Sequence, residues 1–149
     1  QSNEEIKKSL NPQPGHYCGM TKQVHLKETT GESLIERVLC DNPNIQFIDT
    51  KDTNSFNCQP NYYKGALAID RGNMYHFYRQ DENGEWSHKD GGQEVTNLDY
   101  GGNKISDPKY SDRGIYNEFC GYFCVPENDY KDTNMARNNF YEKRLWYRN

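Results

Sequence analysis

The sequence has few aliphatic side chains and no long apolar run. Only 18 of its 149 residues are Ile, Leu or Val, and the mean hydropathy is −1.18. No stretch approaches the roughly 20 apolar residues that a transmembrane helix needs. The composition therefore excludes a membrane-spanning helix and predicts a thin hydrophobic core.

A block of charge of one sign is also missing. The 18 basic and 22 acidic residues are interspersed, for a net charge of −4 and a pI near 5.6. A protein that binds duplex DNA or RNA usually has a basic face and a high pI, so nucleic acid is not expected as the main partner. Residues 143–148 mix Lys and Arg with rings, but the solvated face of a helix explains them better than base stacking does.

Aromatic residues are abundant in place of the aliphatic ones. The chain has 20 of them, of which 12 are Tyr. Because each ring can bury a large area, rings can form the core that the aliphatic residues alone would not. We predict one folded domain over residues 1–126 and a C-terminal appendage over residues 127–149, helical in propensity.

Hydrophobic periodicity predicts an α+β fold with a small, mainly antiparallel sheet. Apolar residues at helical spacing favour a packed helix over residues 32–40, and two acids before two lysines favour a short exposed helix over 3–10. A continuous apolar run indicates a buried strand at 65–69. Residues 45–48, 74–79 and 85–89 are typical of further strands, the last two of a β-meander.

Two segments of the predicted fold contain the residues of chemical interest. Alternation along 74–79 places Met74, His76 and Tyr78 on one face of their strand. His76 is expected to be a half-buried, hydrogen-bonded ring, and His88 a surface or loop-fixing side chain. Residues 116–126 form the densest apolar patch of rings and cysteines, and we expect this cluster to pack on the face of the sheet.

Five cysteines in a short chain favour an oxidising compartment. They allow at most two disulfides, for which Cys40, Cys58, Cys120 and Cys124 are the candidates, with the pairing left open. Because the chain begins with Gln1, we expect that a preceding segment was removed, as in a secreted or particle-borne protein. None of the Asn residues lies in an Asn-x-Ser/Thr acceptor, so glycosylation gives no indication either way.

The centre of the chain contains a distinctive series of residues. It resembles a little-characterised family of microbial and large-virus proteins with a Y-H-[FW]-Y-R-x-D … W-S-H-K core, and the match spans about residues 62–126. That family is similar to the papain-like (NlpC/P60-type) thiol hydrolases. The residues that carry the resemblance are 75–81, Gly84, 86–89, Gly91, 95–97, Asp107, Pro108, Asp112, Arg113 and 119–124.

The resemblance implies a cysteine nucleophile with a histidine base, and the candidates here are Cys18 with His76 or His88. The chain departs from the family, however. The Asn-Cys-Tyr-Asn stretch that carries the family's nucleophile does not occur in residues 1–149, and the position at which such hydrolases usually keep the base is occupied by residues 63–65 without a histidine.

Metal binding is a weaker interpretation of the same residues. Cys120 and Cys124, four positions apart, could hold zinc together with His16, His76 or His88. A second close pair of ligands is missing, so buried or bridged cysteines explain the spacing better. Residues 99–103 lack the alternating carboxylates and terminal Glu of a calcium loop, and we predict no metal and no cofactor.

These patterns lead to one functional hypothesis and two alternatives. The hypothesis is a catalytically silent relative of papain-like hydrolases that acts as a secreted or particle-borne structural or binding module, with other proteins or its own copies as partners. The first alternative is an active cysteine hydrolase of peptide or amide bonds. The second is a disulfide-stapled secreted protein that assembles with itself.

Overall fold

The computed structural model describes residues 13–19, 29–49, 55–90 and 93–127. Its regular elements are one α-helix, two short 3₁₀ helices and five strands. In chain order they are η1 (His16–Cys18), α2 (Gly31–Asp41), β1 (Gln46–Ile48), β2 (Tyr62–Asp70), β3 (Met74–Gln80), β4 (Trp86–His88), η3 (Pro108–Tyr110) and β5 (Glu118–Pro126). The expected short helix over residues 3–10 and the helical appendage beyond residue 127 lie outside the described residues.

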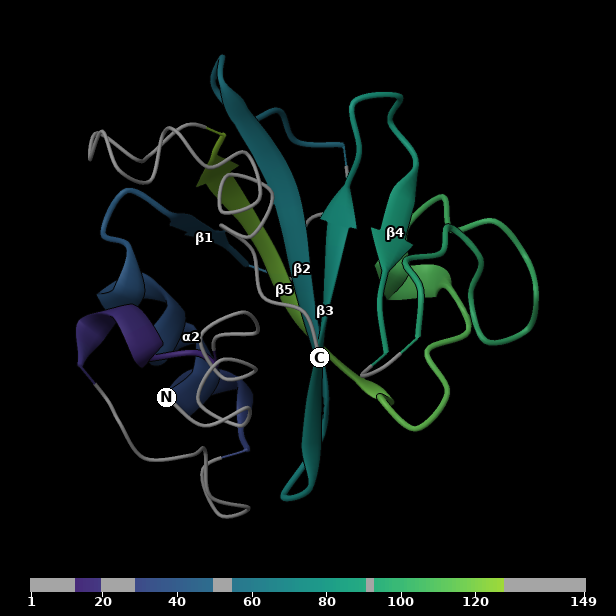
Figure 1. The fold of residues 1–149 in the computed structure, drawn as a ribbon, viewed down its shortest axis with the longest axis horizontal. Coiled ribbons are helices and arrows are strands. Elements are labelled where there is room, and N and C mark those ends of the chain that lie inside the picture. Colours follow the sequence, from purple (N-terminus) through teal and green to yellow (C-terminus); the bar gives the residue numbers. More distant parts are fainter. Residues whose placement is uncertain (1–12, 20–28, 50–54, 91–92, 128–149) are drawn as a thin grey trace, which may run out of the picture.

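The strands form one five-stranded sheet in the order β1-β5-β2-β3-β4 (Figure 1). Every pair of neighbours is antiparallel. The predicted α+β class is therefore confirmed. The predicted helix and the strands near residues 45–48, 65–69, 74–79 and 85–89 are all present, with boundaries that differ by a few residues.

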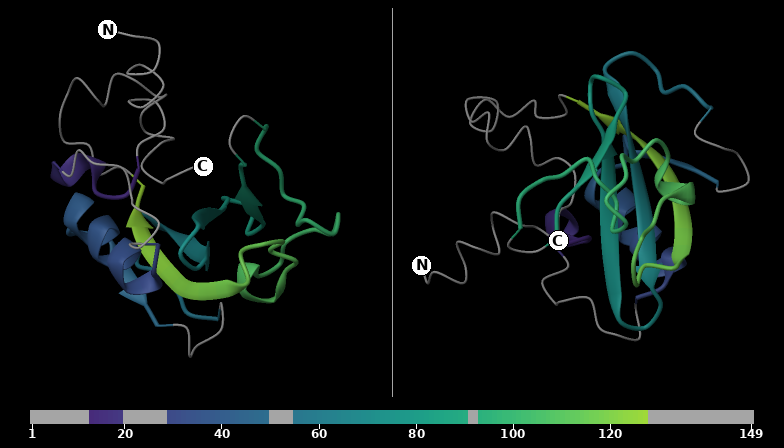
Figure 2. Two further views of the ribbon diagram at one scale, coloured as in Figure 1. Left: turned by 90° about the horizontal axis from the view of Figure 1, so that it is seen from below. Right: turned by 90° about the vertical axis from the view of Figure 1, so that its right-hand side faces the viewer.

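Helix α2 begins at a polar cap and presents a narrow apolar stripe. The Thr30 hydroxyl accepts a hydrogen bond from the Ser33 amide at 3.2 Å, which satisfies one of the free donors of the first turn. Leu34 and Val38, one turn apart, are fully buried. They pack with rings and aliphatic side chains from β2, β3 and β5, so the helix covers one face of the sheet (Figure 2).

The other face of the sheet is covered by a long irregular segment, residues 93–117. Ile105 and Tyr116 from this segment pack against Tyr78, Trp86 and Tyr122 of the sheet. Trp86, Tyr78 and Tyr122 are completely buried. The described residues thus form two cores, one on each face, and rings dominate the second, as the composition predicts.

Strand β5 corrects one expectation. Residues 118–126 do not pack on the face of the sheet but form a central strand between β1 and β2, with residues 89–117 separating β4 from β5. Both faces of β5 are covered, so its sequence is a continuous apolar run without visible alternation. Because this pattern has no alternation, the sequence analysis did not identify residues 118–126 as a strand.

A β-bulge at Gly121 also breaks the two-residue alternation of β5. The register with β2 shifts between Leu67, which faces Gly121, and Ala68, which faces Phe119, so Cys120 is the extra residue. Gly121 has φ +145°, and a Cβ there would lie 2.5 Å from Cε1 of Phe47. Glycine is therefore required by both backbone conformation and space.

Candidate functional site

The structure brings together the two histidines that the sequence analysis singled out. His76 on β3 and His88 on β4 lie on neighbouring strands, and His76 Nε2 is 2.7 Å from His88 Nδ1. His76 is fully buried and His88 is 5% exposed. The expectation of a surface position for His88 is therefore wrong, because the 93–117 segment covers this end of the sheet.

Which histidine donates and which accepts follows from the Leu98 carbonyl, the other hydrogen-bond partner of His88. His88 Nε2 lies 2.7 Å from the carbonyl oxygen of Leu98, which can only accept, so this nitrogen carries the hydrogen. In a neutral His88, Nδ1 is then the acceptor, and His76 Nε2 donates to it. The protons are assigned from the network in this way. His88 thus fixes the loop through Leu98, which is one of the two roles that the sequence analysis expected for it.

A carboxylate and a tyrosine extend the histidine pair toward the surface. His76 Nδ1 is 3.5 Å from Asp90 Oδ1, and the Tyr100 hydroxyl donates to the same carboxylate at 2.6 to 2.7 Å. The His76 ring is stacked on Tyr116 with centroids 4.6 Å apart, and its edge meets Tyr78. These contacts join β3, β4 and the 93–117 segment in one polar cluster inside an aromatic core.

Burial decides the charge of this cluster. Burial, and after it the neighbouring His88, lower the pKa of His76 to about 4, with the Asp90 carboxylate acting in the opposite direction. His76 is therefore neutral at pH 7. Its ring donates a hydrogen bond from β3 to His88 on β4, and an added proton would be placed at Nδ1, facing Asp90.

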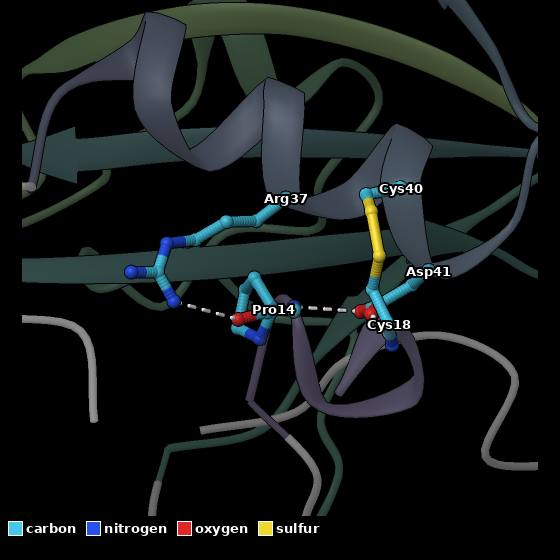
Figure 3. The surroundings of a disulfide bond; sticks show 6 residues. Pro14, Cys18, Arg37, Cys40 and Asp41 are labelled. Carbon is cyan, nitrogen blue, oxygen red and sulfur yellow. Dashed lines mark hydrogen bonds between the residues drawn. A yellow bond between two sulfur atoms is a disulfide. The ribbon is translucent and has the colours of Figure 1, made fainter. Parts of the chain in front are cut away.

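Cys18, the candidate nucleophile, is bonded to Cys40 in a disulfide (Figure 3). A sulfur in a disulfide is not available as a thiolate. The bridge joins η1 to the last turn of α2, and Asp41 supports it by accepting hydrogen bonds from the amides of Gly15 at 2.7 Å and Cys18 at 2.9 Å. The structure thus gives Cys18 a structural position.

A second disulfide joins Cys58 to Cys124 of β5, across 66 positions of the sequence. Cys124 is 2% exposed, whereas both Cys18 and Cys40 lie at the surface. This pairing is one of those that the sequence left open. It fixes the loop before β2 to a central strand of the sheet.

Cys120, the remaining disulfide candidate, is a free cysteine. Burial, followed by the nearby Glu118 carboxylate, raises the pKa of its thiol to about 12, so the thiol is protonated at neutral pH. The bulge at Gly121 turns Cys120 toward the core beneath α2, where its Sγ lies close to Gly31. His76 contacts the rings of the opposite core, so the sheet separates the thiol from the imidazoles.

Among the described residues, the structure therefore shows neither a thiol–imidazole pair nor a metal site. No thiol there lies beside an imidazole. Within the same ranges, no three His, Cys, Asp or Glu side chains gather in a way that could hold a metal ion. None of the helices described is long and apolar enough for a membrane span.

The sequence analysis missed Asp90, Leu98 and Tyr100 as members of the histidine cluster. The contact between the two histidines could have been predicted, since His76 and His88 belong to consecutive strands of a meander and can meet across them. The loop partners could not be found, because the fold of residues 93–117 follows from tertiary contacts and not from a periodic pattern.

Comparison with known proteins gives one partial match. A stretch of 60 residues is 50% identical to insoluble matrix shell protein 1 of Ruditapes philippinarum. The match covers 40% of this chain and 40% of that protein, so the chain corresponds to less than half the length of this relative. No protein-family model matches the chain, and no solved structure matches it.

Proposed function

We propose that this protein is an extracellular structural protein, a disulfide-stabilised module that associates with other protein subunits in an insoluble matrix and catalyses no reaction. The observation that carries the proposal is the 50% identity over 60 residues to an insoluble matrix shell protein. Because the match is partial, the compartment and the partners are inferred.

The disulfides support the extracellular compartment. Four of the five cysteines form two bridges, which persist in oxidising surroundings and are rare in the cytosol. Both bridges tie irregular chain to regular elements: η1 to helix α2, and the loop before β2 to strand β5. Such crosslinks suit a thin, ring-rich core that must remain folded outside the cell.

The placement of sulfur and imidazole supports a role without catalysis. A cysteine hydrolase needs a thiolate within hydrogen-bond reach of a histidine. In the described residues, Cys18 is bonded to Cys40, and Cys120 is a protonated thiol on the other side of the sheet from His76. The histidines are instead occupied with each other and with Leu98.

The relation to papain-like thiol hydrolases is part of the same proposal. A helix packed on one face of an antiparallel sheet is compatible with it, and the residues of the Y-H-F-Y-R … W-S-H-K core form β3, β4 and the turn between them. In this interpretation the core residues serve as a scaffold, with His76 and His88 supporting the loop in place of activating a nucleophile.

The compartment and the structural role can be tested in the source tissue. We expect mass spectrometry to find this protein, with its Cys58–Cys124 crosslinked peptide, in extracellular material that stays insoluble after mild extraction. Recovery only from the cytosolic fraction, with Cys58 and Cys124 reduced, would contradict the proposal.

Catalytic silence needs a separate test on the purified, oxidised protein. We expect a cysteine-directed electrophilic activity probe to leave it unlabelled at neutral pH, with or without His76→Gln. Stoichiometric labelling of one cysteine that disappears in His76→Gln or His88→Gln, while the exposed His16→Gln control keeps it, would favour an active cysteine hydrolase instead.

A further inference from the structure

The segment over residues 93–117 covers one face of the sheet without a covalent anchor, opposite the face that α2 covers (Figure 2). None of the five cysteines of the chain lies in this segment. Both disulfides fasten other parts of the fold, since Cys18–Cys40 joins η1 to α2 and Cys58–Cys124 joins the loop before β2 to β5. Detachment of the segment would therefore break neither crosslink.

The histidine pair lies at the contact between this segment and the sheet. The His76 ring is stacked on Tyr116 with centroids 4.6 Å apart, and His88 Nε2 donates to the Leu98 carbonyl at 2.7 Å. The backbones of His88 and Thr96 exchange two hydrogen bonds, at 2.9 and 3.0 Å. When the segment detaches, both imidazoles lose these neighbours and face water instead.

The closed arrangement has room for one added proton at most. His76 Nε2 donates to His88 Nδ1 at 2.7 Å, so an added proton goes to His76 Nδ1, which lies 3.5 Å from the Asp90 carboxylate. A second proton would place N–H groups of both rings opposite one another and break their hydrogen bond. The first proton already enters a fully buried ring packed against Tyr78 and Tyr116, where a charge is costly.

The groups around His76 come from both strands and from the segment. They are Tyr78 of β3, His88 of β4, Asp90 just beyond it, and Tyr100 and Tyr116 of the segment, with Asp99 and Arg113 farther away. Two carboxylates that help to fix the segment stay ionised in acid. A hydrogen bond from Asn97 lowers the pKa of Glu85, and the Asn103 amide lowers the pKa of Asp99. Mild acid therefore acts on the imidazoles and leaves these two contacts charged.

We propose that residues 93–117 form an acid-sensitive cover, which opens as a unit when protons bind the histidine pair and thereby uncovers the aromatic face of the sheet. Protons favour the open form because its imidazoles are hydrated. Opening exposes the rings of Tyr78, Trp86 and Tyr122 as an apolar surface, while the core beneath α2 stays packed. The inference goes beyond the proposed structural role and does not depend on it.

Hydrogen exchange on the full, oxidised, ¹⁵N-labelled chain tests the opening. The amides of Thr96 and Ile105 report on the segment, since they donate to the carbonyls of His88 and Asn97. Between pH 7.5 and pH 4 we expect their protection, corrected for intrinsic exchange, to fall by about 100-fold, as follows when the pKa of His76 is about 4 closed and about 6.5 open. Its urea dependence should be shallower than for β2 and β5, because opening one segment exposes less surface than global unfolding.

Variants and a direct titration identify the group responsible. His76→Gln keeps an amide that can donate to His88 and should abolish most of the loss of protection, whereas the exposed His16→Gln variant should retain it. Imidazole ¹⁵N shifts of the unaltered chain need no variant, and should show His76 neutral at pH 6.5 with a midpoint near 4.

Four results would each overturn the proposal. They are protection of Thr96 and Ile105 that does not change with pH, a urea dependence equal to that of β2 and β5, a loss of protection that persists in His76→Gln, and a His76 ring that titrates near pH 6.5 in the folded protein. All four concern the segment alone, so they are independent of where the protein is found in the tissue.

Discussion

At the scale of single residues, the histidines show how environment assigns a role. The side-chain type that serves as a base in a hydrolase is here buried, and both histidines are held by hydrogen bonds. His88 links a sheet strand to Leu98, and His76 donates to His88, while its own Nδ1 lies 3.5 Å from the carboxylate of Asp90. Alternation predicted the face on which His76 lies, but its partners come from residues that are distant in sequence and have no periodic pattern.

The burial of His76 predicts a pH dependence of stability. Its pKa is about 4 in the folded protein and about 6.5 in the unfolded chain, so between these values the unfolded state binds more protons. The free energy of unfolding should therefore fall as the pH drops from 6.5 to 4, by up to about 3 kcal/mol for this residue, and this contribution should be constant below pH 4. Urea denaturation across this range measures it.

The groups that face His76 are His88, Asp90, Tyr78, Tyr100 and Tyr116. Replacement by His76→Gln should remove this part of the pH dependence, whatever its effect on stability at pH 7. The exposed His16→Gln variant should retain the full slope. An unchanged slope in His76→Gln would show that the buried ring is not the group responsible.

Gly121 is the residue at which sequence periodicity and structure diverge. Its positive φ and its contact with the Phe47 ring predict that Gly121→Ala destabilises the protein by about 2–4 kcal/mol, since the added methyl group must displace a packed ring. Gly102→Ala is the matched control, because Gly102 also has a positive φ but a Cβ added there would meet nothing within 4 Å. Its cost should be near 1 kcal/mol. Equal thermal shifts for the two variants would contradict the steric argument.

At the scale of elements, the sequence predicts what is local and periodic. Helix α2 has a capping threonine and an apolar stripe, and β3 alternates cleanly, so both could be found from their own residues. Strand β5 could not, because it is buried on both faces and its alternation changes phase at the bulge. Its position between β1 and β2 depends on pairing with strands that lie far away in the sequence, residues 46–48 and 62–69.

The two disulfides constrain elements of unequal importance. Cys58–Cys124 closes the longer loop and holds a central strand, whereas Cys18–Cys40 joins a surface turn to the end of α2. Loop-closure entropy predicts losses of about 4 kcal/mol for Cys58→Ala/Cys124→Ala and about 3 kcal/mol for Cys18→Ala/Cys40→Ala. Packing should widen this difference, because only Cys124 is buried. Chemical denaturation of both double variants checks the order, and a larger loss for Cys18→Ala/Cys40→Ala would contradict it.

At the scale of the whole molecule, the sheet divides the protein into two chemically different halves. One half contains α2 and the free thiol of Cys120, and the other contains the histidine cluster beneath residues 93–117. Composition predicted a thin core of rings, but it could not predict that the core would be split by a sheet. That split is what keeps thiol and imidazole apart in the described residues.

The most direct test of this account is a count of reactive thiols by intact mass after alkylation. The account predicts that the oxidised protein takes up one alkyl group when unfolded, at Cys120, and only slowly while folded, because that thiol is largely buried and its pKa is near 12. Rapid alkylation of Cys18 in the folded protein, abolished by His76→Gln, would contradict the view that the cysteines of this protein are structural.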